Sequence, residues 1–234
     1  MAKPPVSSGR GEIDSFLDKV TRSPALGGGG RGRLIFAMDA TMSREPTWDH
    51  ACAIQGEMFA ETAALGGLDI QLVYYRGFGE CRASRWVGDP RSLLGLMTGV
   101  ACRAGHTQIG KILAHAARET RKRKVQAMVF IGDAVEENPD ELGARAGELG
   151  VLGVPVFLFH EGGNPDVRRV FDEIARLSGG ACCPFDPASA RQLRDLLAAV
   201  AVFAAGGRKA LEDLARQRGG EALRLLTARR GGKA

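Results

Sequence analysis

Apolar runs alternate with stretches of helical periodicity along most of the chain. Continuous apolar runs of this length indicate strands that are buried on both faces of a sheet, whereas apolar residues three and four positions apart indicate helices that cover it. We expect strands at 34–38, 68–75, 81–87, 125–131 and 155–159, with a short last strand within 178–186. We expect helices at 48–65, 90–102, 108–124, 138–149, 165–178 and 188–205.

This alternation of strands and helices predicts an α/β fold: a doubly wound, mainly parallel sheet with helices on both faces. One strand should run against the others. Residues 76–80 form a tight turn with two glycines, so strand 81–87 returns antiparallel to strand 68–75. Its mixture of polar and apolar residues is typical of a sheet edge.

The folded body is expected to cover residues 33–205. Residues 1–32 precede it as a polar segment with a short helix at 11–22 and a linker of four consecutive glycines, which favours flexibility over regular structure. Residues 206–234 follow it as a basic tail with a helical pattern. The chain is therefore predicted to hold one domain with an additional segment at each end.

Composition places the chain among soluble globular proteins, because 44% of its residues are hydrophobic and 25% are charged. The first thirty residues lack the apolar core of a secretory signal, and no apolar stretch approaches the roughly 18–20 residues of a membrane helix. Five scattered cysteines show no zinc-ligand spacing, and Cys182 and Cys183 are expected to be buried thiols. A reducing, cytoplasmic location is the resulting expectation.

The net charge of +5 lies at the two ends of the chain, since residues 1–33 carry +3, residues 206–234 carry +5 and the body carries −3. Basic ends can attract nucleic acid or an acidic protein surface. No aromatic residue lies among the basic groups of the tail to stack on bases, so solubilising tails are favoured over nucleic-acid binding.

The first strand carries the clearest chemical signal. It ends in Asp39, and two hydroxyl residues, Thr41 and Ser43, follow at alternate positions. Open α/β sheets place their ligand sites at the carboxyl ends of strands. One carboxylate and two hydroxyls are hard oxygen ligands, which suit Mg²⁺, Mn²⁺ or Ca²⁺. The alternative is a simple helix cap, in which Asp39 or Thr41 accepts hydrogen bonds from free backbone amides.

Two further loops carry oxygen donors: Thr107 precedes the helix at 108–124, and Asp133 follows the strand that ends at 131. Together with Asp39, Thr41 and Ser43, this order resembles the von Willebrand factor type A (vWA) domain and its metal ion-dependent adhesion site (MIDAS). The family pattern is D-x-S-x-S after the first strand, a threonine before a central helix and an aspartate after the next strand. Thr41 departs from the pattern but retains the hydroxyl.

The resemblance is to bacterial, intracellular vWA proteins, and it implies a Rossmann-like fold with a Mg²⁺ site (or Mn²⁺ or Ca²⁺) held by these five residues. It further implies a protein–protein interaction module that is not an enzyme, in which an Asp or Glu of a partner protein completes the metal coordination. Such proteins often act beside an AAA+ ATPase, so a system of that kind is the expected partner. No membrane contact is expected.

The leading enzyme alternative resembles a haloacid dehalogenase-type phosphohydrolase with Asp39 as the nucleophile. Such phosphatases need a second aspartate two positions later as a general acid, and Thr41 stands there. They also need a basic residue before the last acidic motif, for which Lys122 and Lys124 are the candidates. Nucleic-acid binding through the basic termini stays open as a further alternative.

Overall fold

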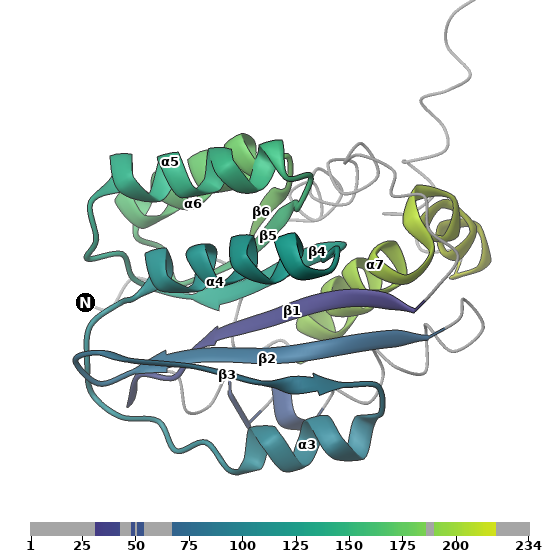
Figure 1. Cartoon of the computed structure of the whole chain (residues 1–234), viewed down its shortest axis with the longest axis horizontal. Helices are drawn as coiled ribbons and strands as arrows, with labels where there is room; N and C mark the ends of the chain where they lie inside the picture. The colour runs from purple at the N-terminus through teal and green to yellow at the C-terminus, as the bar shows by residue number, and fades with distance from the viewer. Residues whose placement is uncertain (1–30, 43–47, 50, 54–66, 186–189, 219–234) are drawn as a thin grey trace, which may run out of the picture.

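The computed structural model describes residues 31–42, 48–49, 51–53, 67–185 and 190–218, and six strands within them form one sheet flanked by helices (Figure 1). The strands are β1 (Gly32–Asp39), β2 (Leu68–Arg76), β3 (Glu80–Val87), β4 (Ala127–Gly132), β5 (Val156–Glu161) and β6 (Ala181–Phe185). The helices are α3 (Pro90–Thr98), α4 (Ile109–Lys122), α5 (Pro139–Val151), α6 (Pro165–Ser178) and α7 (Ala190–Arg218).

The sheet has the order β3-β2-β1-β4-β5-β6. Strands β2, β1, β4, β5 and β6 are parallel to their neighbours, and β3 alone pairs antiparallel, at the edge, with β2. The predicted fold class, including the antiparallel edge strand, is confirmed. In this order β1 and β4 are adjacent, so their carboxyl ends meet near the centre of the sheet.

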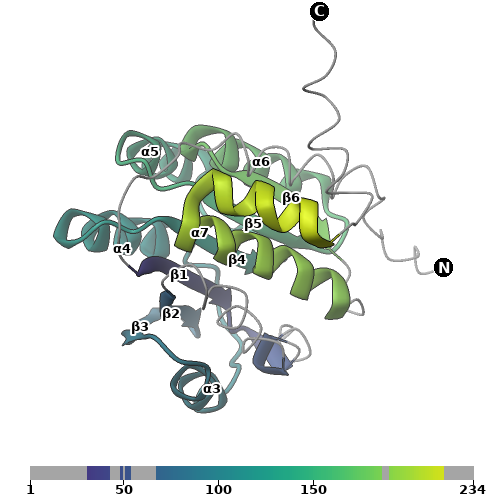
Figure 2. The same ribbon diagram turned by 90° about the vertical axis from the view of Figure 1, so that its right-hand side faces the viewer.

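Helices cover both faces of the sheet (Figure 2). Strand β1 is fully buried, and its side chains alternate between two apolar clusters. Phe36 lies in the cluster that includes residues of α3 and α7, whereas Ile35 lies in the cluster that includes residues of α4, α5 and α6. Burial on both faces explains the continuous apolar run of this strand.

Three helices begin at an Asx-Pro pair, which supplies a side-chain cap followed by a residue that needs no backbone donor. The Oδ1 atom of Asn138 accepts a hydrogen bond of 2.8 Å from the amide of Asp140 at the start of α5. Asn164 caps α6 in the same way, with 2.9 Å to the amide of Asp166. These caps place the helix starts where the sequence predicts them.

The C-terminal helix agrees with the predicted helix at 188–205 up to the glycine pair, beyond which a second helical piece follows. Helix α7 continues to Arg218, and Gly207 interrupts it with a left-handed φ of 67°, so two helical pieces meet at a kink. The break falls where the sequence predicts it, because glycine readily adopts the positive φ that interrupts a helix. The helical pattern predicted for the tail is confirmed as far as Arg218. Within the part of the chain that the structure describes, no helix is long and apolar enough to cross a membrane.

Some predictions fall on other segments of the chain. The helix at 11–22 lies outside the described residues, and of the helix at 48–65 only residues 48–49 and 51–53 are described, all of them helical. The division into 1–32, 33–205 and 206–234 stays a prediction. Cys182 and Cys183 are buried thiols on β6, as expected.

Candidate metal centre

Asp39 ends β1 with only 1% of its surface exposed. Its Oδ1 atom accepts a hydrogen bond of 2.7 Å from the amide of Thr41, so the aspartate shapes the turn that follows the strand. The Thr41 hydroxyl also hydrogen-bonds this carboxylate. The local cap expected as an alternative is therefore present, but it uses only part of the capacity of a carboxylate, which has about four acceptor positions.

Tyr75 supplies a second, buried contact to Asp39. In the parallel register β1 and β2 place these two residues side by side, and the Tyr75 hydroxyl donates to Oδ2 of Asp39 over 3.0 Å. Burial and the neighbouring Asp39 charge raise the pKa of Tyr75 well above its ordinary value, so the phenol keeps its proton and remains a donor.

The environment of Asp39 opposes its ionised form. Burial raises the pKa of Asp39 above its ordinary value, and the negative charge of Asp133 raises it further, while the hydrogen bonds from Thr41 and Tyr75 act in the opposite direction. Two carboxylates that share a partly buried hollow repel each other, and a cation between them relieves that repulsion. The electrostatics of the hollow thus favour a bound cation.

Thr107 is 7% exposed and is held by the loop that follows β4. Its amide donates to Oε2 of Glu136 over 2.8 Å, and its hydroxyl oxygen accepts from the amide of Glu136 over 2.9 Å. His106 places Nδ1 3.0 Å from the same carboxylate oxygen. The two loops that carry Thr107 and Asp133 are therefore fixed to each other by reciprocal hydrogen bonds.

The next residue, Glu137, fixes the start of α4. Its carboxylate accepts hydrogen bonds from the amides of Ile109 (2.6 Å) and Gly110 (2.7 Å), which α4 leaves unpaired because its own N-cap residue makes no side-chain bond. On the other side, Gly105 lies so close to the backbone of Gly77 that any Cβ would overlap it. The hairpin between β2 and β3 thus packs directly on the Thr107 loop.

A hollow of about 280 Å³ lies where these loops meet. It is lined by Asp39, Thr41, Met42, Ala104, Gly105, Thr107, Asp133, Ala134 and Glu136. Four of the five predicted ligands therefore line one hollow. Ser43 lies outside the described residues. His106 is not among the residues that line the hollow.

The donor set fits a hard dication. Asp39 and Asp133 offer carboxylate oxygens, while Thr41 and Thr107 offer neutral hydroxyls, and this combination suits Mg²⁺, Mn²⁺ or Ca²⁺. The described residues contain no group of three or more His, Cys, Asp and Glu side chains placed to hold a metal. Hydroxyl oxygens would consequently have to take part in any metal site in the hollow.

Sequence reasoning missed three residues that build this site: Tyr75, Glu136 and Glu137. The sequence predicts Tyr75 only as a residue of a strand. The register between β1 and β2 shows that it lies beside Asp39. The two glutamates form a short acidic run after Asp133, and only the structure shows that their carboxylates bind the Thr107 loop and the first amides of α4. A short acidic run in a loop can cap a helix elsewhere in the fold, but the sequence does not show which helix start lies beside it.

Neither protein-family profiles nor curated protein sequences match the chain. Several solved structures are nevertheless similar to this one. The SpRpn10 VWA domain superposes with a TM-score of 0.56 at 15% identity, and the match covers 71% of this chain and 94% of that one. The chain has the von Willebrand factor type A fold. An aerotolerance-related membrane protein from Bacteroides fragilis gives a TM-score of 0.54 at 18% identity, and the match covers 69% of this chain and 95% of the other.

A third similar structure carries a metal at the family site. Proximal thread matrix protein 1 from the mussel byssus, solved with a zinc-occupied MIDAS motif, matches with a TM-score of 0.54 at 14% identity. The match covers 74% of this chain and 48% of that protein. The predicted resemblance is confirmed at the level of the fold.

Proposed function

We propose that this chain is a metal-dependent protein-interaction module without catalytic activity. Its dication would be held by Asp39, Thr41, Ser43, Thr107 and Asp133. The main support is that four of these residues, from three separate loops, line one hollow at the carboxyl ends of β1 and β4. Mg²⁺ is the proposed ion, with Mn²⁺ and Ca²⁺ as alternatives of the same hard character.

A bound dication supplies an electrophilic coordination position that accepts a carboxylate from outside. Each residue of the proposed site contributes to this arrangement. Asp39, fixed by Thr41 and Tyr75, presents oxygens of defined orientation, and Asp133 adds the second negative charge. Thr41 and Thr107 add no charge, so the ion stays electrophilic, and an Asp or Glu of a partner protein would complete its coordination.

The comparisons support this proposal at the level of the site type, because one protein of the same fold has a zinc-occupied MIDAS motif. The partner itself is proposed from the sequence alone: an AAA+ ATPase system in the cytoplasm. Nucleic-acid binding by the basic termini stays an alternative, since most of residues 1–33 and 206–234 lie outside the described part of the chain.

Two observations weigh against the phosphohydrolase. Asp39, its nucleophile, is 1% exposed, and both of its oxygens accept hydrogen bonds. The basic candidates are engaged elsewhere, before the start of β4: Lys122 pairs with Glu119 over 2.7 Å, and Lys124 donates to the carbonyl of Leu152 over 2.6 Å. No lysine or arginine is among the described residues that line the hollow.

Calorimetric titration of Mg²⁺, Mn²⁺ and Ca²⁺ into the wild type and Asp39→Ala tests the proposal. Asp166→Ala is the matched control, because this aspartate lies on the exposed surface of α6 with a side chain that is 80% exposed. We expect binding to the wild type and the control, and none to Asp39→Ala. Phosphatase activity is measured on the same samples, and circular dichroism verifies that each variant is folded.

Each outcome separates the candidates. Metal binding that depends on Asp39, without hydrolysis, supports the interaction module. Metal-dependent hydrolysis that disappears in Asp39→Ala replaces it with the phosphohydrolase. Equal metal binding by the wild type and Asp39→Ala refutes the site.

A further inference from the structure

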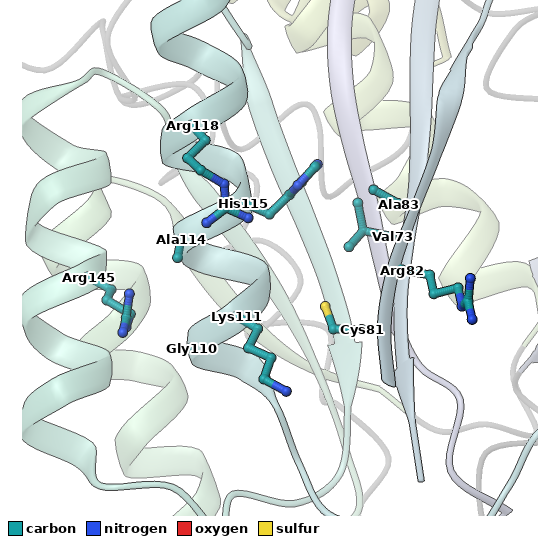
Figure 3. A pocket seen from close by; sticks show the side chains of 10 residues that line it. All are labelled: Val73, Cys81, Arg82, Ala83, Gly110, Lys111, Ala114, His115, Arg118 and Arg145. Atoms are coloured by element: carbon teal, nitrogen blue, oxygen red, sulfur yellow. The ribbon is translucent and has the colours of Figure 1, made fainter. Parts of the chain in front are cut away.

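A second hollow, of about 360 Å³, lies beside α4 and shares no lining residue with the candidate metal site. Figure 3 shows α5, α4 and the strands β2 and β3 following one another across the view, with the hollow between them. Its lining residues are Val73, Cys81, Arg82, Ala83, Gly110, Lys111, Ala114, His115, Arg118 and Arg145. We call this hollow the α4 groove.

The α4 groove has three cationic side chains and no acidic one. They are Lys111, Arg118 and Arg145, and all three residues are exposed. Arg82 also lines the groove, but its side chain points away from α4 (Figure 3). Arg118 and Arg145 make no hydrogen bond or ion pair with any residue in the part of the chain that the structure describes. Two guanidinium groups are therefore available for an anion from outside, and Arg is the side chain best suited to bind a carboxylate through two parallel hydrogen bonds.

The acidic residues around the groove are already engaged. The Glu80 carboxylate binds Arg76 and Arg82, both at distances near 3 Å. Glu137 binds the first amides of α4, and Glu119 binds Lys122. None of them forms an ion pair with Arg118 or Arg145 in the part of the chain that the structure describes, although Glu137 lies near Arg145 beside Gly110.

The remaining lining is neutral. Gln71 donates through Nε2 to the carbonyl of Ser84, which leaves its Oε1 as the acceptor, 2.8 Å from Nε2 of His115. His115 therefore donates to Gln71, and burial lowers the pKa of this histidine. Cys81 and Ala114, which are both partly exposed, add small apolar surfaces, and the fully buried Val73 lies beneath them. The groove thus combines an apolar floor with a cationic wall.

The spread of the charges indicates the shape of the ligand. Lys111 and Arg118 lie two turns apart, about 10 Å along the axis of α4. A single phosphate group is too small to contact both, whereas an extended chain covers this span with about three residues. The Lys111 amine donates to the Gly79 carbonyl (3.0 Å) and to Gln108 Oε1 (2.8 Å), which leaves one of its three N–H donors for a ligand. We propose that the α4 groove binds an extended acidic segment of a partner protein, with carboxylates at Arg118 and Arg145, a further one at Lys111, and apolar side chains on the floor.

This proposal is independent of the metal site, and its test keeps the two separate. The probe is a fluorescein-labelled peptide of alternating Glu and Val, titrated with the full-length protein in EDTA and followed by fluorescence anisotropy. We expect binding that weakens as salt rises. The double variant Arg118→Glu/Arg145→Glu is expected to lose affinity by at least about tenfold, because two charge-assisted contacts are removed.

The basic ends of the chain attract the same peptide, so a matched control is required. Arg169→Glu/Arg176→Glu changes the net charge equally at two exposed, ion-paired arginines of α6. We expect it to keep affinity within about twofold of the wild type, because neither arginine lines the groove and both are exposed to screening by salt. The neutral variant Arg118→Gln, checked for its thermal transition, serves if the double reversal does not fold.

Two further measurements locate the site. Carbodiimide coupling joins a peptide carboxylate to a nearby lysine amine, and we expect the product at Lys111. Competition with inorganic phosphate distinguishes a small-anion site. If the groove and control variants lose equal amounts of affinity for the peptide, the proposal is overturned. It is also overturned if phosphate displaces the peptide at concentrations too low to act by screening. Both results would leave the metal-dependent module untouched, since the binding titrations contain EDTA. The carbodiimide reaction is run on the metal-free protein after EDTA has been removed, because EDTA itself carries carboxylates that would couple.

Discussion

Replacing Tyr75 with phenylalanine removes one hydroxyl group beside Asp39 and leaves the aromatic ring in place. The hydroxyl is the donor to Oδ2 of Asp39 over 3.0 Å, and both residues are at most 1% exposed. Water cannot easily replace the lost donor at such a site. The variant therefore leaves a buried carboxylate with one hydrogen bond fewer.

The expected magnitude follows from the charge of the acceptor. A hydrogen bond to an ionised group contributes about 1.5–3 kcal/mol to the free energy of unfolding. For a domain of this size, a loss of about 2 kcal/mol lowers the melting temperature by roughly 4–8 °C. Tyr75→Phe should show this loss at pH 7 in the presence of EDTA.

The loss should depend on pH. Tyr75 stabilises the ionised form of Asp39, so the difference between wild type and variant is present above the folded-state pKa of Asp39, which burial raises from 3.8. Below that pKa the carboxyl group is protonated in both proteins, and the difference shrinks. Denaturant unfolding at a series of pH values measures this dependence.

Tyr74→Phe is the matched control for this series. Tyr74 lies on the same strand and packs edge-on against Trp48, and its hydroxyl makes no hydrogen bond within the described part of the chain. We expect less than about 0.5 kcal/mol of change for Tyr74→Phe. Equal stability losses in the two variants, or a Tyr75→Phe loss that is the same at every pH, would refute the reasoning.

Two further predictions concern the residues around the site. Glu137→Ala should destabilise the protein by about 2–4 kcal/mol, because it leaves the amides of Ile109 and Gly110 without their carboxylate, and urea unfolding checks this; a change under about 0.5 kcal/mol contradicts it. Arg76 and Arg82 lower the pKa of Glu80 from 4.5 to about 2, so the stabilising ion pair is present above pH 4.5 and lost as the pH falls towards 2. Thermal unfolding of Glu80→Gln should therefore differ from wild type at pH 7 and converge with it near pH 2, and a constant difference would count against it.

The order and direction of the strands follow from patterns that the sequence carries locally. Continuous apolar runs, such as the one ending at Asp39, predict central parallel strands, and the tight turn at 76–80 predicts the antiparallel edge. The gathering of Asp39, Thr107 and Asp133 is predictable for the same reason, because each lies in a loop at one edge of the sheet. Ser43 as a ligand stays a prediction.

What the sequence does not reveal depends on register and packing. Whether Asp39 meets Tyr75 is decided by which residues of β1 and β2 pair, and a shift by one position would turn that side chain to the other face. The α4 groove likewise needs α4, α5 and the strands β2 and β3 in place together. The break at Gly207, by contrast, is predictable, because the glycine pair interrupts the helical pattern in the sequence itself.

The four hydrogen bonds that Glu136 and Glu137 share with Thr107, Ile109 and Gly110 make the start of α4 and the loop after β4 one mechanical unit. Shifting either element alone would break all four, at a cost on the order of 5 kcal/mol. This side of the hollow is accordingly preorganised, and an incoming protein spends little of its binding free energy on ordering it. A partner selects by fitting this fixed wall, and its dissociation rate should be sensitive to small changes in shape there.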